Sequence, residues 1–212
     1  MNPTIEINPL VLIVSGPSGS GKSTLMQRIL DMDRTMPSVS CTTRPRRATE
    51  SSWKCYDFVT EEQFEAMVRE DEFLEYARVF GKHSYGTPRK WLVQSRETGK
   101  DLVLEIDVQG AAQVKKKLPE AVGIFILPPS REELERRLRG RGQDAEEEIQ
   151  RRLAQARDEI QAFGKYYDYC VINDDVERAG RDVQAIVTAL RCSSARNRGR
   201  VQSLLTSFGG KG

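Results

Sequence analysis

Cysteine and histidine are scarce in this sequence, and their scarcity argues against two kinds of stabilising site. The 212 residues include four cysteines, Cys41, Cys55, Cys170 and Cys192, and one histidine, His83. No two cysteines form a C-x-x-C pair, and one histidine adds little to a ligand set, so the sequence does not predict a structural zinc site. Four cysteines in a chain of this length do not make a disulfide framework either. We therefore expect reduced cysteines that act as small packing residues.

Long apolar runs and an excess of one charge are also missing. Apolar runs such as Leu10–Val14 are far too short to span a bilayer. No charged stretch precedes the first of them, as a secretory signal would require. The 33 basic and 31 acidic residues nearly cancel, whereas a nucleic-acid-binding protein more often has a clear basic excess. The sequence thus predicts a cytoplasmic protein that binds neither membranes nor nucleic acids.

The apolar residues that are present form short blocks typical of an α/β domain. Leu10–Val14 is a β-branched run, which is typical of a strand buried on both faces. Further strands are predicted at Leu102–Val108, Val122–Leu127 and Tyr169–Ile172, and helices at residues 23–30, 61–69 and 176–190. Thr60 and Gln63 can form a capping box at the start of the second of these helices. Alternation of strands and helices favours a parallel sheet covered by helices.

A glycine-rich loop joins the first strand to the first helix. The loop fits the pattern G-x-x-x-x-G-K-S/T with Gly16, Pro17, Ser18, Gly19, Ser20, Gly21, Lys22 and Ser23. Glycines allow backbone N–H groups to converge on phosphate oxygens. The lysine can reach the β- and γ-phosphates, the serine hydroxyl can ligate Mg²⁺, and the following helix presents its positive end. A chance glycine turn is the alternative, and the flanking strand and helix argue against it.

Charged residues elsewhere suit the same chemistry. Glu105 and Asp107 lie at the end of a predicted buried strand, where alternation places both on one face and where an acidic residue can help to hold Mg²⁺. Arg137, Arg141 and Arg152 lie near the helix break at residues 140–142. Arginine forks suit a transferring phosphoryl group. The neighbouring Asp and Glu residues leave an ordinary exposed helix face as the alternative. Beside a phosphate-binding loop, a mobile arginine lid is the better interpretation.

Seven further segments support a family resemblance over about residues 10–190. The segments are Ser38-Val39-Ser40-Cys41-Thr42-Thr43-Arg44, Tyr56-Asp57-Phe58-Val59, Tyr85-Gly86-Thr87, Leu104-Glu105-Ile106-Asp107-Val108-Gln109-Gly110, Ile126-Leu127-Pro128-Pro129-Ser130, Arg139-Gly140-Arg141-Gly142 and Ile172-Asn173-Asp174-Asp175. In their order and spacing the chain resembles a bacterial guanylate kinase. The resemblance implies a P-loop NTPase-type parallel sheet flanked by helices, an inserted GMP-binding subdomain and a helical lid. It also implies phosphoryl transfer from ATP to GMP, with Mg²⁺ as cofactor.

The resemblance assigns roles to individual residues. Guanine would be bound by Ser40, Glu75, Thr87 and Asp107, and the GMP phosphate by Arg44, Arg47, Tyr56 and Tyr85. ATP would be bound by residues 16–23 together with Thr24 and Asn173. Lys22, Arg137, Arg141 and Arg152 would be catalytic, and Ser23 and Glu105 would hold the metal ion, the glutamate through water or directly. The glutamate at 75 makes chemical sense, because a carboxylate accepts both N1–H and the exocyclic amine of guanine, whereas adenine offers an acceptor at N1.

The sequence departs from the family pattern at three places. The stretch Arg46–Trp53 lacks the usual P-R-x-G-E, so either Arg46 or Arg47 would hold the GMP phosphate. Only the second residue of the family's tyrosine pair is kept, as Tyr85. Glu105 replaces the more usual aspartate and is one methylene longer, which can displace its contact with the metal ion.

The predicted layout has one domain with three parts. The core comprises residues 10–36 and 91–190, the GMP-binding subdomain about 37–90 and the lid about 137–155. Residues 1–9 and 191–212 are predicted as flexible tails. Two alternatives stay open, a kinase for another small acceptor and a non-catalytic guanylate-kinase-like interaction module. A third, nucleic-acid binding through Arg196–Arg200, depends only on the short basic tail. The oligomeric state is not indicated.

Overall fold

The central sheet is built from the continuous apolar runs. The computed structural model describes residues 8–46, 56–79, 83–140 and 145–209. In the order of the sheet, its strands are β2 (Thr35–Pro37), β7 (Asp101–Glu105), β1 (Val11–Ser15), β8 (Val122–Leu127) and β9 (Tyr169–Ile172), and every pairing is parallel. The middle strands β1, β7 and β8 are almost fully buried, as expected for a parallel sheet covered on both faces. The predicted α/β class is confirmed.

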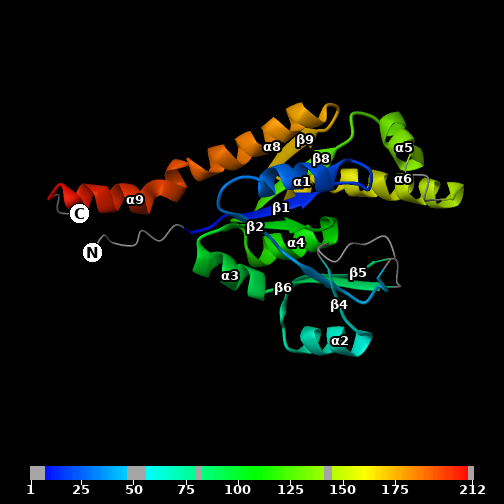
Figure 1. Ribbon diagram of the computed structural model, residues 1–212, viewed down its shortest axis with the longest axis horizontal. Helices are drawn as coiled ribbons and strands as arrows, with labels where there is room; N and C mark the ends of the chain where they lie inside the picture. The colour runs from blue at the N-terminus through cyan, green and yellow to red at the C-terminus, as the bar shows by residue number, and fades with distance from the viewer. Residues whose placement is uncertain (1–7, 47–55, 80–82, 141–144, 210–212) are drawn as a thin grey trace.

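Helices cover both faces of this sheet (Figure 1). On one face α1 (Lys22–Leu30) and α8 (Val176–Arg191) share an apolar cluster that includes Leu25, Ile29 and Val183. On the other face α3 (Lys90–Thr98) and α4 (Val108–Lys117) contribute residues such as Trp91 and Val114. Both cores contain residues from β1, because successive side chains of a strand point to opposite faces. The glycine-rich loop therefore starts from a strand that is buried along its whole length.

A second, smaller sheet lies below the first in Figure 1. It has the order β4 (Tyr56–Phe58), β3 (Ser40–Thr42), β6 (His83–Pro88) and β5 (Phe73–Val79). Helix α2 (Glu61–Arg69) packs on it through Phe64, whose ring stacks on Phe73 at a centroid distance of 4.6 Å. The predicted capping box is present, with Thr60 and Gln63 bonded reciprocally. The small sheet thus has a separate core of its own.

Two further helices form a pair on the right-hand side of Figure 1. Helices α5 (Arg131–Gly140) and α6 (Glu146–Gln161) pack on one another through Leu134, Leu138, Ile149, Leu153 and Ala156. The short helix α7 (Phe163–Tyr166) then leads into β9. Residues 141–144, with the predicted break at Gly142 and Arg141, lie outside the described residues. Helix α5 ends at Gly140 and α6 begins at Glu146, so the predicted interruption of the helix near Gly140 is confirmed.

The C-terminal segment differs from the prediction. Residues 191–212 were expected to form a flexible tail, but Ser194–Ser207 form helix α9, which continues from α8 away from the sheet (Figure 1). Arginine, leucine and glutamine favour helices, and Gly199 is the one glycine inside it. The junction is held by Asp101, whose carboxylate accepts from Arg191 Nε at 2.8 Å and Arg196 at 3.3 Å. The basic composition suggested a frayed end, whereas Arg191 and Arg196 hold the start of α9 against the sheet through their bonds to Asp101.

Within the part of the chain that the structure describes, no helix combines the length and the apolar character needed to cross a membrane.

Candidate active site

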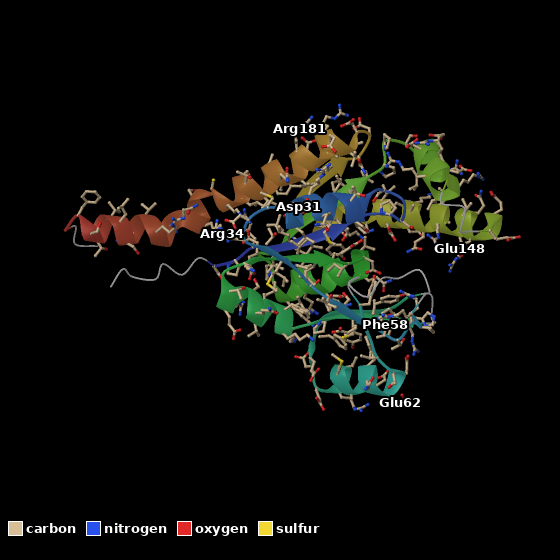
Figure 2. All side chains as sticks on the ribbon, viewed as in Figure 1. Asp31, Arg34, Phe58, Glu62, Glu148 and Arg181 are labelled. Carbon is tan, nitrogen blue, oxygen red and sulfur yellow. The ribbon has the colours of Figure 1, made fainter. Side chains whose placement is uncertain are left out.

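A cleft of about 580 Å³ lies where the carboxyl ends of β1 and β7 face the small sheet and α6. In Figure 2, Phe58 marks the small sheet and Glu148 marks α6. The cleft is lined by Gly16, Ser18, Gly19, Gly21, Lys22, Ser23, Thr24, Ser40, Arg44, Tyr56, Glu75, Ala77, Tyr85, Glu105, Ile106, Asp107, Glu148, Arg152, Gln155 and Glu159. Segments far apart in the sequence therefore contribute to one polar site, at the edge where ligands bind in open α/β sheets.

The glycine-rich loop takes a backbone shape that other residues would resist. Gly16, Gly19 and Gly21 have φ values of 147°, 93° and 88°. A Cβ on Gly16 would lie 2.2 Å from the carbonyl oxygen of Ile126. The buried amide of Asn173 lies against Gly21 and donates to the carbonyl oxygen of Ser20 at 2.8 Å. The loop shape is thus set by its own glycines and by the contacts with Ile126 and Asn173. The Ser20 N–H is used inside the loop, where it donates to the carbonyl oxygen of Pro17 at 3.1 Å, and the glycine N–H groups can converge on an anion.

Lys22 and Ser23 lie at the start of α1, next to Glu105. The hydroxyl of Ser23 donates to Glu105 Oε1 at 3.1 Å, and Lys22 Nζ lies 3.7 Å from the same oxygen. Lys22 and Ser23 belong to the first turn of α1, which follows β1, and Glu105 is the last residue of β7. Strands β1 and β7 are parallel neighbours, so their carboxyl ends lie side by side. The structure therefore brings together the hydroxyl, the ammonium group and the carboxylate that the sequence singled out.

Asp107 has a different position from the one expected. Strand β7 ends at Glu105, so Asp107 does not alternate with it on one strand face. It is instead the N-cap of α4, and its Oδ1 accepts from the backbone N–H groups of Gln109 at 3.0 Å and Gly110 at 2.9 Å. The apolar run through Val108 suggested a longer strand, but an aspartate before a helical segment is a strong N-cap. Asp107 still lines the cleft.

A buried carboxylate lies at the far end of the cleft, on the small sheet. Glu75 is only 5% exposed and accepts a hydrogen bond from Thr87 Oγ1 at 2.6 Å. Ser40 Oγ lies 3.2 Å from Thr87 Oγ1, so three strands contribute to one hydrogen-bonded row. Burial raises the pKa of Glu75 to about 7, the bond from Thr87 opposes this shift, and the charge of Asp107 adds to it. A carboxylate held this way can accept from donors on a flat ligand.

An aromatic and cationic group forms the next part of the small sheet. The rings of Tyr56 and Tyr85 meet edge to face with centroids 5.9 Å apart. The Arg44 guanidinium lies 5.8 Å from the Tyr56 ring centroid and 5.7 Å from that of Phe58. Phenol hydroxyls and a guanidinium group are donors that suit a phosphate. Arg47 lies outside the described residues, whereas Arg46 lies over the Phe58 ring at 4.9 Å.

The predicted lid arginines differ in what they contact. Arg152 lines the cleft and donates to Ser18 Oγ at 3.1 Å. Arg137 instead donates to the carbonyl oxygens of Asn173 at 2.8 Å and Ser20 at 3.4 Å, behind the loop. Both arginines are also paired with a glutamate of their own helix, Glu133 or Glu148. The structure thus places Arg152 in the cleft and Arg137 and Asn173 beside the loop that forms its wall.

Sequence reasoning missed one row of cleft residues. Glu148, Gln155 and Glu159 line the cleft together with Arg152, at spacings of four, three and four residues along α6. Ile149, Leu153 and Ala156 form the buried stripe on another side of the same helix. Helical periodicity in the sequence could have placed these polar residues on one face, but only the fold shows that this face is turned to the cleft.

Comparisons with known proteins agree on one family. The family model described as guanylate kinase matches residues 8–190. A guanylate kinase from Caldanaerobacter subterraneus is 46% identical, over 92% of this chain and 94% of the relative. One from Shewanella violacea is 50% identical, over 85% and 87%. Among solved structures, guanylate kinase from Anaplasma phagocytophilum superposes with a TM-score of 0.77 at 33% identity, over 98% of this chain and 99% of that one.

Proposed function

Because the chain belongs to the guanylate kinase family, we propose that it transfers the γ-phosphoryl group of ATP to GMP, which yields ADP and GDP. One structural observation carries the proposal. A single cleft joins a phosphate-binding loop to a buried carboxylate, Glu75, that can accept the donor edge of guanine. ATP and GMP are both small molecules, and the reaction belongs to purine nucleotide metabolism in the cytoplasm.

ATP is the ligand of the glycine-rich loop in this proposal. Residues 16–24 surround the β- and γ-phosphates, with backbone N–H groups and Lys22 as donors. Arg152 contributes charge from α6, and Arg141 would contribute it from the segment after α5. Arg137 and Asn173 support the loop from behind through their bonds to Ser20. Lys22, Arg152 and Arg141 would neutralise the phosphate oxygens as the bond to the leaving ADP lengthens.

Mg²⁺ is the cofactor that we assign to this reaction. The Ser23 hydroxyl and Glu105 carboxylate are 3.1 Å apart, and both are oxygen donors of the kind that Mg²⁺ prefers. In the described residues no group of three or more Asp, Glu, His or Cys residues could hold a metal ion by itself. This fits an ion that keeps waters and phosphate oxygens as ligands. When bound, it neutralises charge on the phosphates.

GMP is the ligand of the small sheet. Its guanine N1–H and exocyclic amine would donate to Glu75, with Ser40, Thr87 and Asp107 beside it. Its phosphate would be held by Arg44, Tyr56 and Tyr85, together with Arg47. Adenine would present an acceptor to Glu75, which explains why AMP is a poor substrate in this proposal.

Positioning and charge neutralisation are sufficient for the mechanism, without a protein nucleophile or a dedicated base. The GMP phosphate oxygen attacks the γ-phosphorus in line with the ADP leaving group. We propose that residues 37–90 and about 137–155 close on the core, residues 10–36 and 91–190, during the reaction. Closure would exclude water, which would otherwise hydrolyse ATP.

An acceptor panel tests the proposal. ADP formation from ATP is measured with GMP, AMP, CMP and UMP at equal concentrations. We expect GMP to exceed the other three in kcat/KM by at least about 10²-fold, because a wrong base leaves Glu75 without its two donors. Equal turnover of a second nucleotide would favour the alternative kinase for another acceptor. Nucleotide binding without turnover of any acceptor would instead favour the non-catalytic module.

A further inference from the structure

Strand β5, which carries Glu75, lies at the edge of the small sheet. Within the described part of the chain it pairs with β6 alone. Helix α4 lies against its outer edge, between β5 and the central sheet (Figure 1). The pairing of β5 with β6 shifts register between Phe73 and Glu75, as at a β-bulge. Because the ladder is irregular directly before Glu75, the position of this carboxylate depends on what else holds β5.

Gln113 of α4 bonds to the outer edge of β5 as a neighbouring strand would. Its Nε2 donates to the carbonyl oxygen of Tyr76 at 2.7 Å, and its Oε1 accepts from the backbone N–H of the same residue at 3.2 Å. A side-chain amide can do both at once, because it carries an acceptor oxygen and donor hydrogens. Both polar backbone groups of the residue after Glu75 are therefore bonded to a single side chain of α4.

Two further contacts come from the same face of α4, one turn on either side of Gln113. Lys117 Nζ donates to the carbonyl oxygens of the two residues before Glu75, at 2.8 Å and 3.3 Å. Gly110 lies against the carboxylate itself, since a Cβ at this position would be 2.7 Å from Glu75 Oε2. Residues 110, 113 and 117 share one face at helical spacing. The helix thus contacts β5 directly before, at and directly after Glu75.

Helix α4 also carries the second carboxylate of this end of the cleft. Asp107 caps the helix and accepts from the N–H of Gly110 at 2.9 Å, so both carboxylates lie beside one glycine. The helix is packed on the central sheet through Ala111 and Val114, which are completely buried. One helix therefore connects Glu75 both to Asp107 and to the sheet from which the glycine-rich loop starts.

We propose that Gln113 is a positioning residue for guanine recognition, which acts through the β5 backbone and holds the Glu75 carboxylate against Gly110. The inference rests on the proposed function and adds to it how the carboxylate is aimed. Two donors on one base edge require one orientation of the carboxylate, whereas a single donor accepts a wider range. IMP keeps N1–H but lacks the exocyclic amine, so it is the ligand that separates these two cases.

Calorimetric titration with GMP and IMP gives the first test. Gln113→Met keeps the length of the side chain but removes both bonds to Tyr76. We expect the Kd for GMP to rise about tenfold and that for IMP about threefold, because GMP loses the alignment of two bonds and IMP of one. The control is Gln94→Met, an exposed glutamine of α3, which should bind both as the wild type does. A Kd for GMP within twofold of the wild type, or an equal rise for both ligands, overturns the proposal.

Steady-state kinetics separate positioning from a general loosening of the fold. In Gln113→Met, KM for GMP should rise about tenfold, while kcat at saturating GMP and KM for ATP stay within twofold. A similar loss in all three parameters would show a merely structural role and would contradict the inference. Lys117→Met should raise KM for GMP by about threefold, and it carries the test if Gln113→Met does not fold. An unchanged KM for GMP in folded Lys117→Met would then count against the proposal.

A double variant asks whether Gln113 acts through Glu75. In the Glu75→Ala background, Gln113→Met should change KM for GMP by less than about twofold, because the group that it positions is already gone. A further tenfold rise would mean that Gln113 affects GMP by another route, and the inference would fail.

Gly110→Ala tests the position of the carboxylate from the other side. The new methyl group would occupy the place of Glu75 Oε2, so we expect KM for GMP to rise about tenfold even though alanine favours a helix more than glycine does. Gly199→Ala in α9, where no atom lies within 4 Å of the new Cβ, should keep the wild-type KM. An unchanged KM in Gly110→Ala overturns the inference. Absence of GMP-dependent ADP formation in the wild type would instead count against the proposed function.

Discussion

The two ends of the cleft are built in opposite ways. At the glycine-rich loop, the cleft is lined by residues from one short stretch, 16–24, and the shape of that stretch follows from local φ values. On the small sheet, the side chains come from β3, β4, β5 and β6, and only pairing of these strands brings them together. In the proposed function, the first end recognises what nucleotides share, the phosphates, and the second end recognises what differs between them, the base. A shared group can be bound by one backbone motif, whereas discrimination between bases needs side chains from several strands.

The largest expected effect is at the loop. Lys22→Ala should lower kcat for GDP formation by about 10²–10³-fold, because a preorganised donor to the developing charge is lost. The matched control is Lys116→Ala on α4, an exposed lysine, which should keep wild-type kcat. Steady-state assays at saturating ATP and GMP measure both. Near wild-type turnover of Lys22→Ala would mean that the loop end of the cleft does not stabilise the transferring phosphoryl group through Lys22.

At the other end, Glu75→Gln should raise KM for GMP by about 10- to 100-fold and leave KM for ATP within twofold. The amide offers one acceptor to a base edge with two donors, so one of the polar groups is left unpaired. Glu97→Gln, an exposed change on α3, is the control. An equal rise in both KM values would mean that the two ends are not separate recognition sites.

Backbone shape at the loop can be tested without removing a charge. In Gly16→Ala the new Cβ would meet the Ile126 carbonyl oxygen at a φ of 147°, and we expect a loss of about 1–3 kcal/mol in the free energy of unfolding. Gly164→Ala in α7, where no atom lies within 4 Å of the new Cβ, should be neutral. Urea denaturation measures the difference. Equal stability of the two variants would argue that the loop tolerates side chains.

The smallest expected effect is the pH dependence of GMP binding. Burial raises the pKa of Glu75 to about 7, so the carboxylate that accepts guanine is lost as the pH falls through that value. KM for GMP should therefore rise about three- to tenfold between pH 8 and pH 6. Comparison with Glu75→Gln cancels the ionisation of the GMP phosphate, and the variant should lack this part of the profile. A profile that is the same in both proteins would place the titration elsewhere.

Prediction from the sequence succeeded where the signal was local. The strand and helix around the loop, β8, and helix α2 with its capping box were all predicted from runs of a few residues. Errors occurred where two local signals competed. The apolar run through Val108 extended β7 too far, because the N-cap preference of Asp107 prevailed over strand propensity. The basic composition after Arg191 concealed α9, whose start is anchored by the buried Asp101.

By itself, the sequence determined the glycine-rich loop, because the positions of its glycines decide the backbone conformation between β1 and α1. It also determined the α/β class, because apolar periodicity reflects burial. Only the tertiary structure decided the rest. It showed that Glu75, Thr87 and Ser40 form one hydrogen-bonded row, that Arg152 lines the cleft while Arg137 lies behind the loop, and that Glu148, Gln155 and Glu159 line the cleft from α6. The side chains in these contacts lie between 12 and 134 positions from their partners in the sequence, and they meet only when sheets and helices pack.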